Sequence, residues 1–456
     1  MEPTLKKYKF KNLFIYFLLV AFSVSLYCPA QINAKKYRLS IEKTTEKIKI
    51  DGVLDEITWS NAEVAKDFFM ITPIDTGKAN QFSEARLSYD DEFLYMAIIF
   101  FNNKVQGDYV VESLKRDFSF GKNDNFLVAI DPFNNRSTGF TFGLNAYGAQ
   151  WDGTMFDGRN VDLNWDAKWY SQVHFDEEKW VCEIAIPFKS IRFDSNITEW
   201  GINFSRLDLK ASEKSSWAPV PRQFPSVTLS YAGTLVWNTP PPQQGSNVSI
   251  IPYVSNILNQ DFQEKIQNEF KIGGDVKYNI TSALNLDLTI NPDFSQAEVD
   301  QQITNLDRFE LFFPERRQFF LENADLFTNF GYKTIRPFFS RRIGLQVPIV
   351  GGARLSGNID ENWRLGLMNI QTQKDIEEGL NAANFGVLTV QKKVLDRSNI
   401  NFIFINKQPW KDKAIAASNP NRNAGIEYNY FSADNLWNGK LMFLQSFSPE
   451  REKKGP

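Results

Sequence analysis

The chain has 456 residues, of which 43% are hydrophobic and 23% charged, and its formal net charge is −3. This length suits two or three domains, and the weakly acidic balance lacks the basic footprint of a nucleic-acid-binding protein. A single histidine, His174, argues against a multi-histidine metal site or a histidine-based catalytic triad. The 40 phenylalanines and 11 tryptophans suit β-structure, sugar stacking or a membrane-interface belt.

Residues 1–30 have the pattern of a secretory signal peptide. Lysines at positions 6, 7, 9 and 11 precede an apolar run from Leu13 to Cys28, and Pro29-Ala30 follows. Loss of Cys28 with the signal would leave Cys182 as the only thiol, which we expect to be buried on a strand. The sequence therefore predicts an exported protein.

Residues 38–238 are predicted to form one β-rich domain. A turn is expected at Asp51-Gly52, a short helix over Leu54–Phe68 and a hairpin at Asp90-Asp91. Further strand segments follow at short intervals: NFLVAIDPF, GFTFGLNAYG, KWYSQVHFD, KWVCEIAIPF and EWGINFSRLDL. Strands at this spacing favour an antiparallel β-sandwich.

Residues 239–247 contain three consecutive prolines and are predicted to be a stiff linker. Over residues 248–456 apolar and polar residues alternate in many short segments: VSIIPYVSNIL, FKIGGDVKYNI, ALNLDLTINPDF, GGARLSGNI, WRLGLMNIQTQ, NFGVLTVQKKV, NINFIFINKQ, AGIEYNYFS and GKLMFLQSF. One interpretation is a soluble sandwich or barrel. The other, which the signal peptide favours, is an antiparallel outer-membrane β-barrel.

The predicted barrel is expected to be incomplete in this chain. The last residues, 452–456, are polar, and no terminal aromatic strand is present. A membrane barrel must close without a free edge, so we expect further strands in a longer protein.

Residues 291–327 interleave aromatic residues with charges. The charged residues are Asp307, Arg308, Glu310, Glu315, Arg316, Arg317 and Glu322. Because buried charges must be paired, this composition suits a plug or a lumen wall better than an apolar core. The charges could form a gate or a purely structural network, and we favour the structural one.

Two blocks of sequence resemble known families. IDGVLDEITWSNA (Ile50–Ala62), DNFLVAIDP, FGLNAYGAQWDG and WVCEIAIPF resemble family 9 carbohydrate-binding modules in order and spacing. NPDFSQAEVDQ, FELFFPERRQFFLE and FFSRRIG resemble outer-membrane proteins that carry domain of unknown function 5916. The resemblance implies a glycan-binding β-sandwich joined to a barrel in the Gram-negative outer membrane, with membrane lipid around it. It implies no known reaction, and protein partners stay unknown.

Candidate ligand-binding residues follow from this resemblance, because such modules stack sugars on aromatic rings and fix hydroxyls with polar side chains. Trp151, Trp165 and Trp169 are the candidate stacking residues, with Asn145, Gln150 and Asp152 around them. Trp59 and Trp180 lie inside the family signatures and are expected in the core. Trp151 and Trp169 could equally be core residues.

Arg116 and Asp124 are a further candidate pair for hydroxyl recognition. A structural ion pair at a sheet edge is the alternative that we favour. The family resemblance also implies that calcium can bind, and Asp51, Asp55, Asp131 and Asp152 are the oxygen donors considered. The metal ligands stay unknown, and no other cofactor is expected.

The function predicted is glycan binding at an outer-membrane barrel. A carbohydrate-active hydrolase with a role in carbohydrate catabolism is one alternative, although no segment resembles a hydrolase catalytic domain and motifs such as GxSxG and HExxH are absent from the sequence. A structural or secretion-linked barrel protein without sugar binding is the other.

Overall fold

The structure is a computed structural model that describes residues 33, 35–102, 107–175, 178–242, 248–259, 267–292, 304, 313, 315–332, 334–344, 347–376, 379–410, 419–432 and 436–449. The predicted signal peptide, part of the predicted linker and residues Asp307, Arg308 and Glu310 lie outside these ranges. In the described part of the chain, no helix is both long and apolar enough to cross a membrane.

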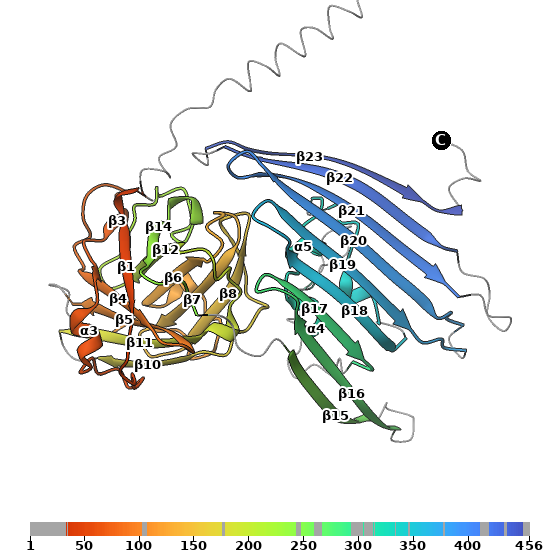
Figure 1. Cartoon of the computed structure of the whole chain (residues 1–456), viewed down its shortest axis with the longest axis horizontal. Helices are drawn as coiled ribbons and strands as arrows, with labels where there is room; N and C mark the ends of the chain where they lie inside the picture. Colours follow the sequence, from red (N-terminus) through yellow and green to blue (C-terminus); the bar gives the residue numbers. More distant parts are fainter. Residues whose placement is uncertain are drawn as a thin grey trace, which may run out of the picture.

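The first half of the chain folds into a curled sheet of 14 strands (Figure 1). The strands are β1 (Arg38–Lys43), β2 (Val64–Ala65), β3 (Phe69–Thr72), β4 (Ser83–Tyr89), β5 (Phe93–Phe101), β6 (Asn125–Asp131), β7 (Gly139–Asn145), β8 (Gln150–Phe156), β9 (Asn160–Asp162), β10 (Tyr170–Phe175), β11 (Lys179–Pro187), β12 (Glu199–Asp208), β13 (Glu213–Ser216) and β14 (Gly233–Trp237). Short helical turns are α3 (Ile57–Asn61), η1 (Phe120–Lys122), η2 (Phe188–Ser190) and η3 (Leu229–Tyr231).

Strand β1 joins the two layers of this β-sandwich. Its first residues pair with β14 and its last residues with β4, and both pairings are parallel. The main path runs β10-β11-β5-β4-β1 in one layer and β14-β12-β6-β7-β8-β9 in the other. The sandwich is therefore antiparallel as predicted, except at β1.

The sandwich core is made by the inward faces of both layers. Trp180 and Phe100 stack with ring centroids 4.1 Å apart, and Phe126 packs against Phe100 from the other layer. Trp59 and Trp180 are buried, which confirms their prediction as core residues. Cys182 is buried on β11 as expected, and burial raises the pKa of its thiol.

The helix predicted over Leu54–Phe68 is wrong in its extent. Only Ile57–Asn61 is helical, and Val64–Ala65 instead pairs with β4 as strand β2. Pairing with an existing sheet overrides a weak local helix preference. The hairpin predicted at Asp90-Asp91 is confirmed, since β4 and β5 pair antiparallel across it.

The second half of the chain forms a nine-stranded antiparallel sheet in simple sequential order. Its strands are β15 (Val248–Asn259), β16 (Gln267–Asn279), β17 (Leu284–Ile290), β18 (Ile349–Asn358), β19 (Trp363–Thr372), β20 (Ala383–Val394), β21 (Ser398–Pro409), β22 (Asn421–Phe431) and β23 (Asn438–Phe447). Each strand coincides with one of the predicted alternating segments. Among the described residues β15 and β23 are the edges, and closure into a barrel is not seen.

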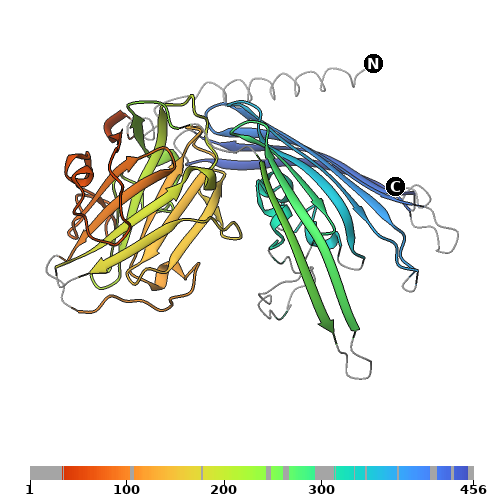
Figure 2. The ribbon, with the colours of Figure 1, turned by 60° about the horizontal axis from the view of Figure 1, so that its bottom comes forward.

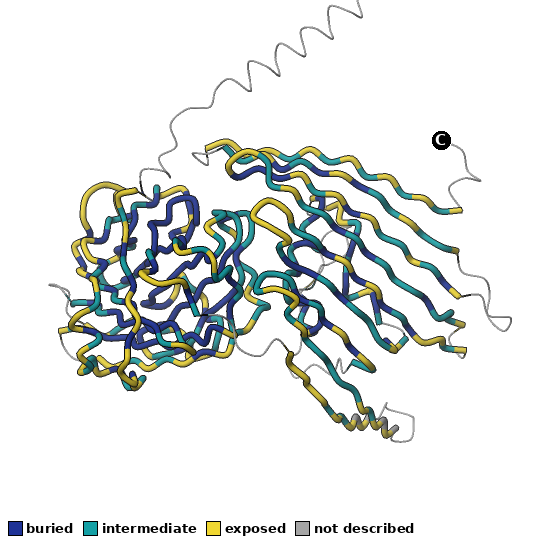
Figure 3. Tube along the Cα trace, viewed as in Figure 1, coloured by how far each residue is buried: buried dark blue, intermediate teal, exposed yellow. Residues whose placement is uncertain are grey.

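The two faces of the nine-stranded sheet have opposite polarity. One face carries an apolar row that crosses five strands in register: Leu365, Val390, Phe402, Ile426 and Phe443. The other face carries the polar row Arg364, Gln391, Asn401 and Glu427. Phe443 is 65% exposed whereas Glu427 is 1% exposed, and exposure alternates along the strands (Figure 3). Along these rows the exposed side is apolar and the covered side polar, the reverse of a water-soluble sheet, although the covered face also carries the buried residues Met368, Ile370, Val387 and Ile403.

The segment between β17 and β18 packs against the polar face through its aromatic residues (Figure 2). It contains α4 (Gln318–Leu321), α5 (Asp325–Thr328) and η4 (Ser340–Arg342). Phe319, Phe320 and Phe327 form a buried cluster with Met368, Ile370 and Val387 of the sheet. The expectation that its charges suit a plug better than an apolar core was therefore incomplete, because the segment also builds an apolar core.

Among the charges of this segment that the structure describes, Glu315, Arg317 and Glu322 have partners of opposite sign, as expected. Arg317 donates to both carboxylate oxygens of Glu315, at 2.8 and 2.7 Å, and both side chains are 7% exposed. Arg317 also donates to the carbonyl oxygens of Ser340 and Ile343, each at 2.6 Å. These bonds fix the backbone of the segment, which agrees with the structural interpretation of Glu315 and Arg317.

Candidate functional site

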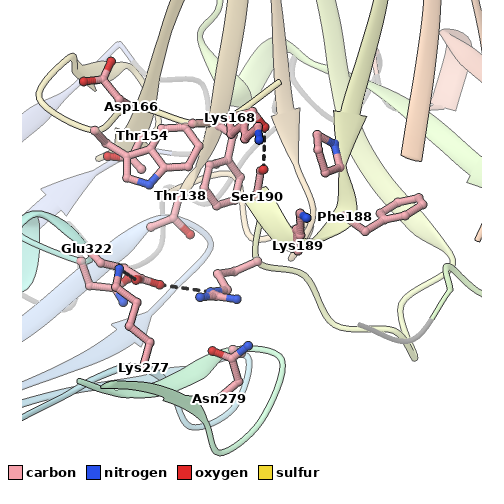
Figure 4. Close-up of a pocket in the computed structure, with 18 of the residues that line it drawn as sticks. Thr138, Thr154, Asp166, Lys168, Phe188, Lys189, Ser190, Lys277, Asn279 and Glu322 are labelled. Atoms are coloured by element: carbon pink, nitrogen blue, oxygen red, sulfur yellow. Dashed lines mark hydrogen bonds and ion pairs between the residues drawn. The ribbon is translucent and has the colours of Figure 1, made fainter. Parts of the chain in front are cut away.

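A cleft of about 650 Å³ lies where the sandwich meets the nine-stranded sheet (Figure 4). The sandwich contributes the β4–β5 turn, the segment between β9 and β10, and η2. The other wall comes from β15 to β17 and from the α4–α5 segment. This volume falls in the range of ligand-binding clefts, which also occur preferentially between domains.

Trp165 is the tryptophan among the aromatic residues in the wall of the cleft. It is half-buried, and its ring packs 5.1 Å from that of Phe140 and 6.2 Å from that of Phe142. The packing fixes the ring, while its remaining surface is open to the cleft. Phe93 and Met155 extend the apolar part of the wall.

Hydroxyl and amide groups surround this apolar surface. Thr138, Thr154 and Ser190 line the sandwich side, and Asn279 and Asn323 line the opposite side. Ser190 donates its hydroxyl to the carbonyl oxygen of Lys168 at 2.7 Å, which ties η2 to the segment that carries Trp165. Aromatic surface in the same cleft as uncharged hydrogen-bonding groups suits a neutral, hydroxyl-rich ligand.

Most charges in the cleft have a partner of opposite sign. Arg192 of the sandwich donates through Nε to Glu322 at 3.0 Å, and Lys277 of β16 donates to the same carboxylate at 3.3 Å. Burial by itself would raise the pKa of Glu322. The two cations outweigh that effect and, with a contribution from Arg354, lower the pKa to about 2. Glu322 thus remains ionised and joins the two halves of the chain.

A second ion pair lines the cleft. Arg364 of β19 donates to both carboxylate oxygens of Asp325, at 2.7 and 3.1 Å. Lys168 and Lys189 also line the cleft and are exposed. Since the paired charges cancel, the cleft has no strong preference for a charged ligand.

Three of the predicted site residues lie together behind this cleft. Arg116 donates to Gln150 at 2.8 Å, forms an ion pair with Asp152 and also pairs with Asp166, which lines the cleft. Arg116 further donates to the carbonyl oxygen of Ala167 at 3.0 Å. This network positions the Trp165 segment, so in the structure Arg116 makes structural ion pairs.

The remaining predicted residues are buried. Trp151 is 7% exposed and Trp169 4% exposed, so neither ring face is open to a ligand in this structure. Asn145 accepts the backbone amide groups of Tyr147 and Ala149 and shapes the β7–β8 turn. Asp124 accepts backbone amides of Val110 and Leu209 and is not joined to Arg116 by any bond in the described residues.

Three of the four oxygen donors considered for calcium have separate partners, and the fourth, Asp55, is exposed. Asp51 pairs with Lys49, and Asp131 accepts the backbone amides of Asn135 and Arg136. Asp152 belongs to a different acidic group with Asp117 and Asp166, whose carboxylate oxygens lie within 4.8 Å of one another. Burial raises the pKa of both Asp117 and Asp152 to about 6. Arg116 already supplies positive charge to this group, which does not suit a calcium site.

Comparison with known proteins finds one family match in the sandwich and another at the start of the nine-stranded sheet. Residues 50–219 match the carbohydrate family 9 binding domain-like family, and residues 246–362 match the domain of unknown function DUF5916. The chain therefore combines a family 9 carbohydrate-binding-like domain with a DUF5916 domain. No curated protein matches it.

Solved structures similar to the sandwich include a family 9 carbohydrate-binding module from Caldicellulosiruptor kristjanssonii, in complex with cellotriose and with glucose. These are 14% identical to the chain, cover 44% of it and 94% and 96% of their own length, and have TM-scores of 0.33 and 0.32. A protein from Bacteroides uniformis ATCC 8492 is 13% identical, covers 44% of this chain and 98% of its own, and has a TM-score of 0.36.

The sequence did not single out the cleft. Its residues come from segments far apart in the chain, for example Thr138, Lys277 and Glu322. Of the predicted residues, Trp165 lines the cleft directly. For Glu322, the only local indication in the sequence was a carboxylate placed directly after the apolar residues FFL.

Proposed function

We propose that this chain is an outer-membrane protein that binds a neutral glycan in the cleft between its sandwich and its nine-stranded sheet. The observation that carries the proposal is the half-buried Trp165 ring in the wall of a cleft of about 650 Å³ that threonine, serine and asparagine side chains also line. The family 9 match of the sandwich supports a carbohydrate ligand.

Sugar binding is the chemistry that this wall serves best. One face of a pyranose ring is apolar and can cover the indole, while the hydroxyl groups at its edge need hydrogen-bond partners. Leaving such partners unmade in a closed site costs roughly 1–3 kcal/mol each. The amide and hydroxyl groups around Trp165 can satisfy them.

Replacement of Trp165 by alanine is expected to weaken oligosaccharide binding by about tenfold or more, because the stacking surface is lost. Calorimetric titration of the full chain in detergent with cellotriose and glucose, and with a wider set of neutral oligosaccharides, measures the change. Trp165→Phe should recover part of the affinity. Phe82→Ala, an exposed aromatic residue of the sandwich outside the cleft, is the matched control. Equal affinity of wild type and Trp165→Ala would refute the cleft as the binding site.

The outer-membrane part of the proposal is supported by the inverted polarity of the nine-stranded sheet. Side chains such as Phe402, Ile426 and Phe443 point away from the covered face. An outward apolar face with inward polar residues is the pattern of strands that contact lipid on one side. We propose that this sheet is part of a barrel wall.

Phe402→Arg is expected to destabilise the chain in lipid vesicles by about 2–4 kcal/mol, the cost of a cation at a lipid-facing position near the bilayer centre. Urea unfolding in vesicles measures this. Leu114→Arg, at an exposed site of the sandwich, should change stability by less than about 0.5 kcal/mol. The membrane proposal fails if the two variants behave alike, or if cell fractionation recovers the chain outside the outer membrane.

A further inference from the structure

A cluster of aromatic rings lies at the other end of the sandwich from the cleft. Tyr147 and Phe175 are 48% and 49% exposed, with ring centroids 5.6 Å apart. Tyr109, half-buried beneath them, packs 6.0 Å from Phe175 and 6.2 Å from the core residue Trp180. We name Tyr109, Tyr147 and Phe175 the aromatic end cluster.

The position of this cluster follows from strand β10. The strand begins at Tyr170, whose ring contacts Phe93 in the wall of the cleft, and ends at Phe175. Five residues of extended strand span about 17 Å. The aromatic end cluster is therefore separate from the cleft, and one ligand unit cannot occupy both.

The backbone that carries the rings is held by hydrogen bonds and strand pairing. Tyr147 sits at the tip of the β7–β8 turn, where Asn145 Oδ1 accepts its backbone amide at 3.1 Å and Gly148 adopts a φ of +86°. Phe175 ends a paired strand opposite Trp180. Because the backbone is already ordered, binding costs only the side-chain entropy of the rings.

Polar groups lie at the edge of the rings. Lys210 Nζ is 3.9 Å from the centroid of Tyr109 and donates to the carbonyl oxygen of Gly107 at 3.4 Å. The Tyr109 hydroxyl accepts a hydrogen bond from Asn102 at 2.6 Å. The cluster thus has the same two components as the cleft, namely aromatic surface and adjacent hydrogen-bonding groups.

We propose that the aromatic end cluster is a second binding site for a pyranose unit of a neutral glycan. The proposal rests on the proposed function for the class of ligand. The residues of the aromatic end cluster are different from those of the cleft, and all of them lie within the family 9 match at 50–219. Tyr147 and Phe175 would cover the apolar face of the sugar, and Lys210 would donate to a ring hydroxyl. A glycan long enough to reach both sites would bind more tightly than a short one. Once one of its sugar units is bound, the effective concentration of the other unit at the second site is high.

The test is calorimetric titration of the full chain with cellotriose and with a longer cello-oligosaccharide. Wild type is expected to bind two cellotriose molecules. The variant Tyr147→Ala/Phe175→Ala is expected to bind one, and to bind the longer glycan about tenfold more weakly. Tyr147→Phe/Phe175→Tyr, which keeps both rings, should behave as wild type, and Leu114→Ala is the exposed aliphatic control.

The outcomes separate this inference from the cleft proposal. Loss of one site in the end-cluster variant, with the other retained until Trp165 is replaced, supports both. One site in wild type that disappears in Trp165→Ala and is untouched in the end-cluster variant overturns the end cluster alone. One site that disappears only in the end-cluster variant supports the cluster and refutes the cleft. A wild-type chain that binds neither oligosaccharide overturns the inference.

Discussion

Replacement of Glu322 by alanine is expected to loosen the sandwich from the nine-stranded sheet and to cost roughly 3 kcal/mol or more. The Glu322 side chain is 15% exposed and accepts from Arg192 on one side of the junction and Lys277 on the other. Asn285 of β17 also donates to it. Removing the carboxylate leaves two cations facing each other in a partly closed site, which is more costly than losing one surface ion pair.

Urea unfolding of the full chain at neutral pH measures this cost. Glu92→Ala is the matched control, because Glu92 lines the same cleft but is exposed. A double-mutant cycle with Arg192→Met isolates the pair across the junction. Since both walls of the cleft depend on this contact, Glu322→Ala should also weaken glycan binding. A loss of stability no larger than that of Glu92→Ala would show that Glu322 does not hold the halves together.

Lowering the pH is expected to reduce the free energy of unfolding, as the Glu322→Ala substitution does. The pKa of Glu322 is lowered from 4.5 to about 2 in the folded chain, so the unfolded state takes up protons first as the pH falls. Its contribution is complete above about pH 4.5 and is lost as the pH falls towards 2. Glu322→Gln should flatten that part of the stability curve. An unchanged curve in the Gln variant would contradict this assignment.

The strands of the second sheet were predictable because their pattern is local. In ALNLDLTI every second residue is apolar, and β17 buries Asn285, Asp287 and Thr289 while Leu288 and Ile290 are exposed. Alternation alone identifies a strand with two different faces. It does not say which face is covered. That depends on the α4–α5 segment, whose phenylalanines pack on the polar side.

The candidate site was much less predictable, because burial decides whether an aromatic residue can bind. Trp151 and Trp169 lie near predicted loops, yet in the structure they pack into the sandwich. Tyr147, two residues after the candidate Asn145, is the residue that the turn exposes. The sequence identified the right region of the chain, because the predicted residues are near neighbours of Tyr147. Which aromatic residue faces solvent depends on contacts between strands that are distant in the chain.

The segment IDGVLDEITW, which resembles the family 9 modules, has a structural role that could not be predicted from the sequence. Glu183 is fully buried on β11, and its carboxylate accepts three hydrogen bonds from the segment IDGVLDEITW. The donors are the backbone amides of Asp51 and Gly52, at 3.0 and 2.9 Å, and Nε1 of Trp59 at 3.0 Å. The segment is thereby pinned to the outside of the β5–β11 layer, where Trp59 packs against Tyr95 and Ala97.

Glu183→Ala is expected to destabilise the sandwich by roughly 3 kcal/mol or more, because three donors at the buried site lose their acceptor and a cavity is left. Gln172→Ala is the matched control, since Gln172 pairs with Glu183 across β10 and β11 but is exposed. Glu183→Gln keeps the volume and part of the acceptor capacity and should cost less. Urea unfolding followed by tryptophan fluorescence measures all three variants.

The same experiment distinguishes a local from a global role for this contact. If Glu183 only fastens the 44–61 segment, the fluorescence of Trp59 will change at low urea while the rest of the sandwich unfolds at its usual midpoint. If the segment is part of the cooperative core, one transition will shift as a whole. The second result is expected, because the segment ends in α3, β2 follows almost directly in the chain, and β2 pairs with β4 of the layer. If Glu183→Ala had the same free energy of unfolding as Gln172→Ala, the prediction would be wrong. Water would then replace the carboxylate at no cost, and the 44–61 segment would not contribute to the stability of the sandwich.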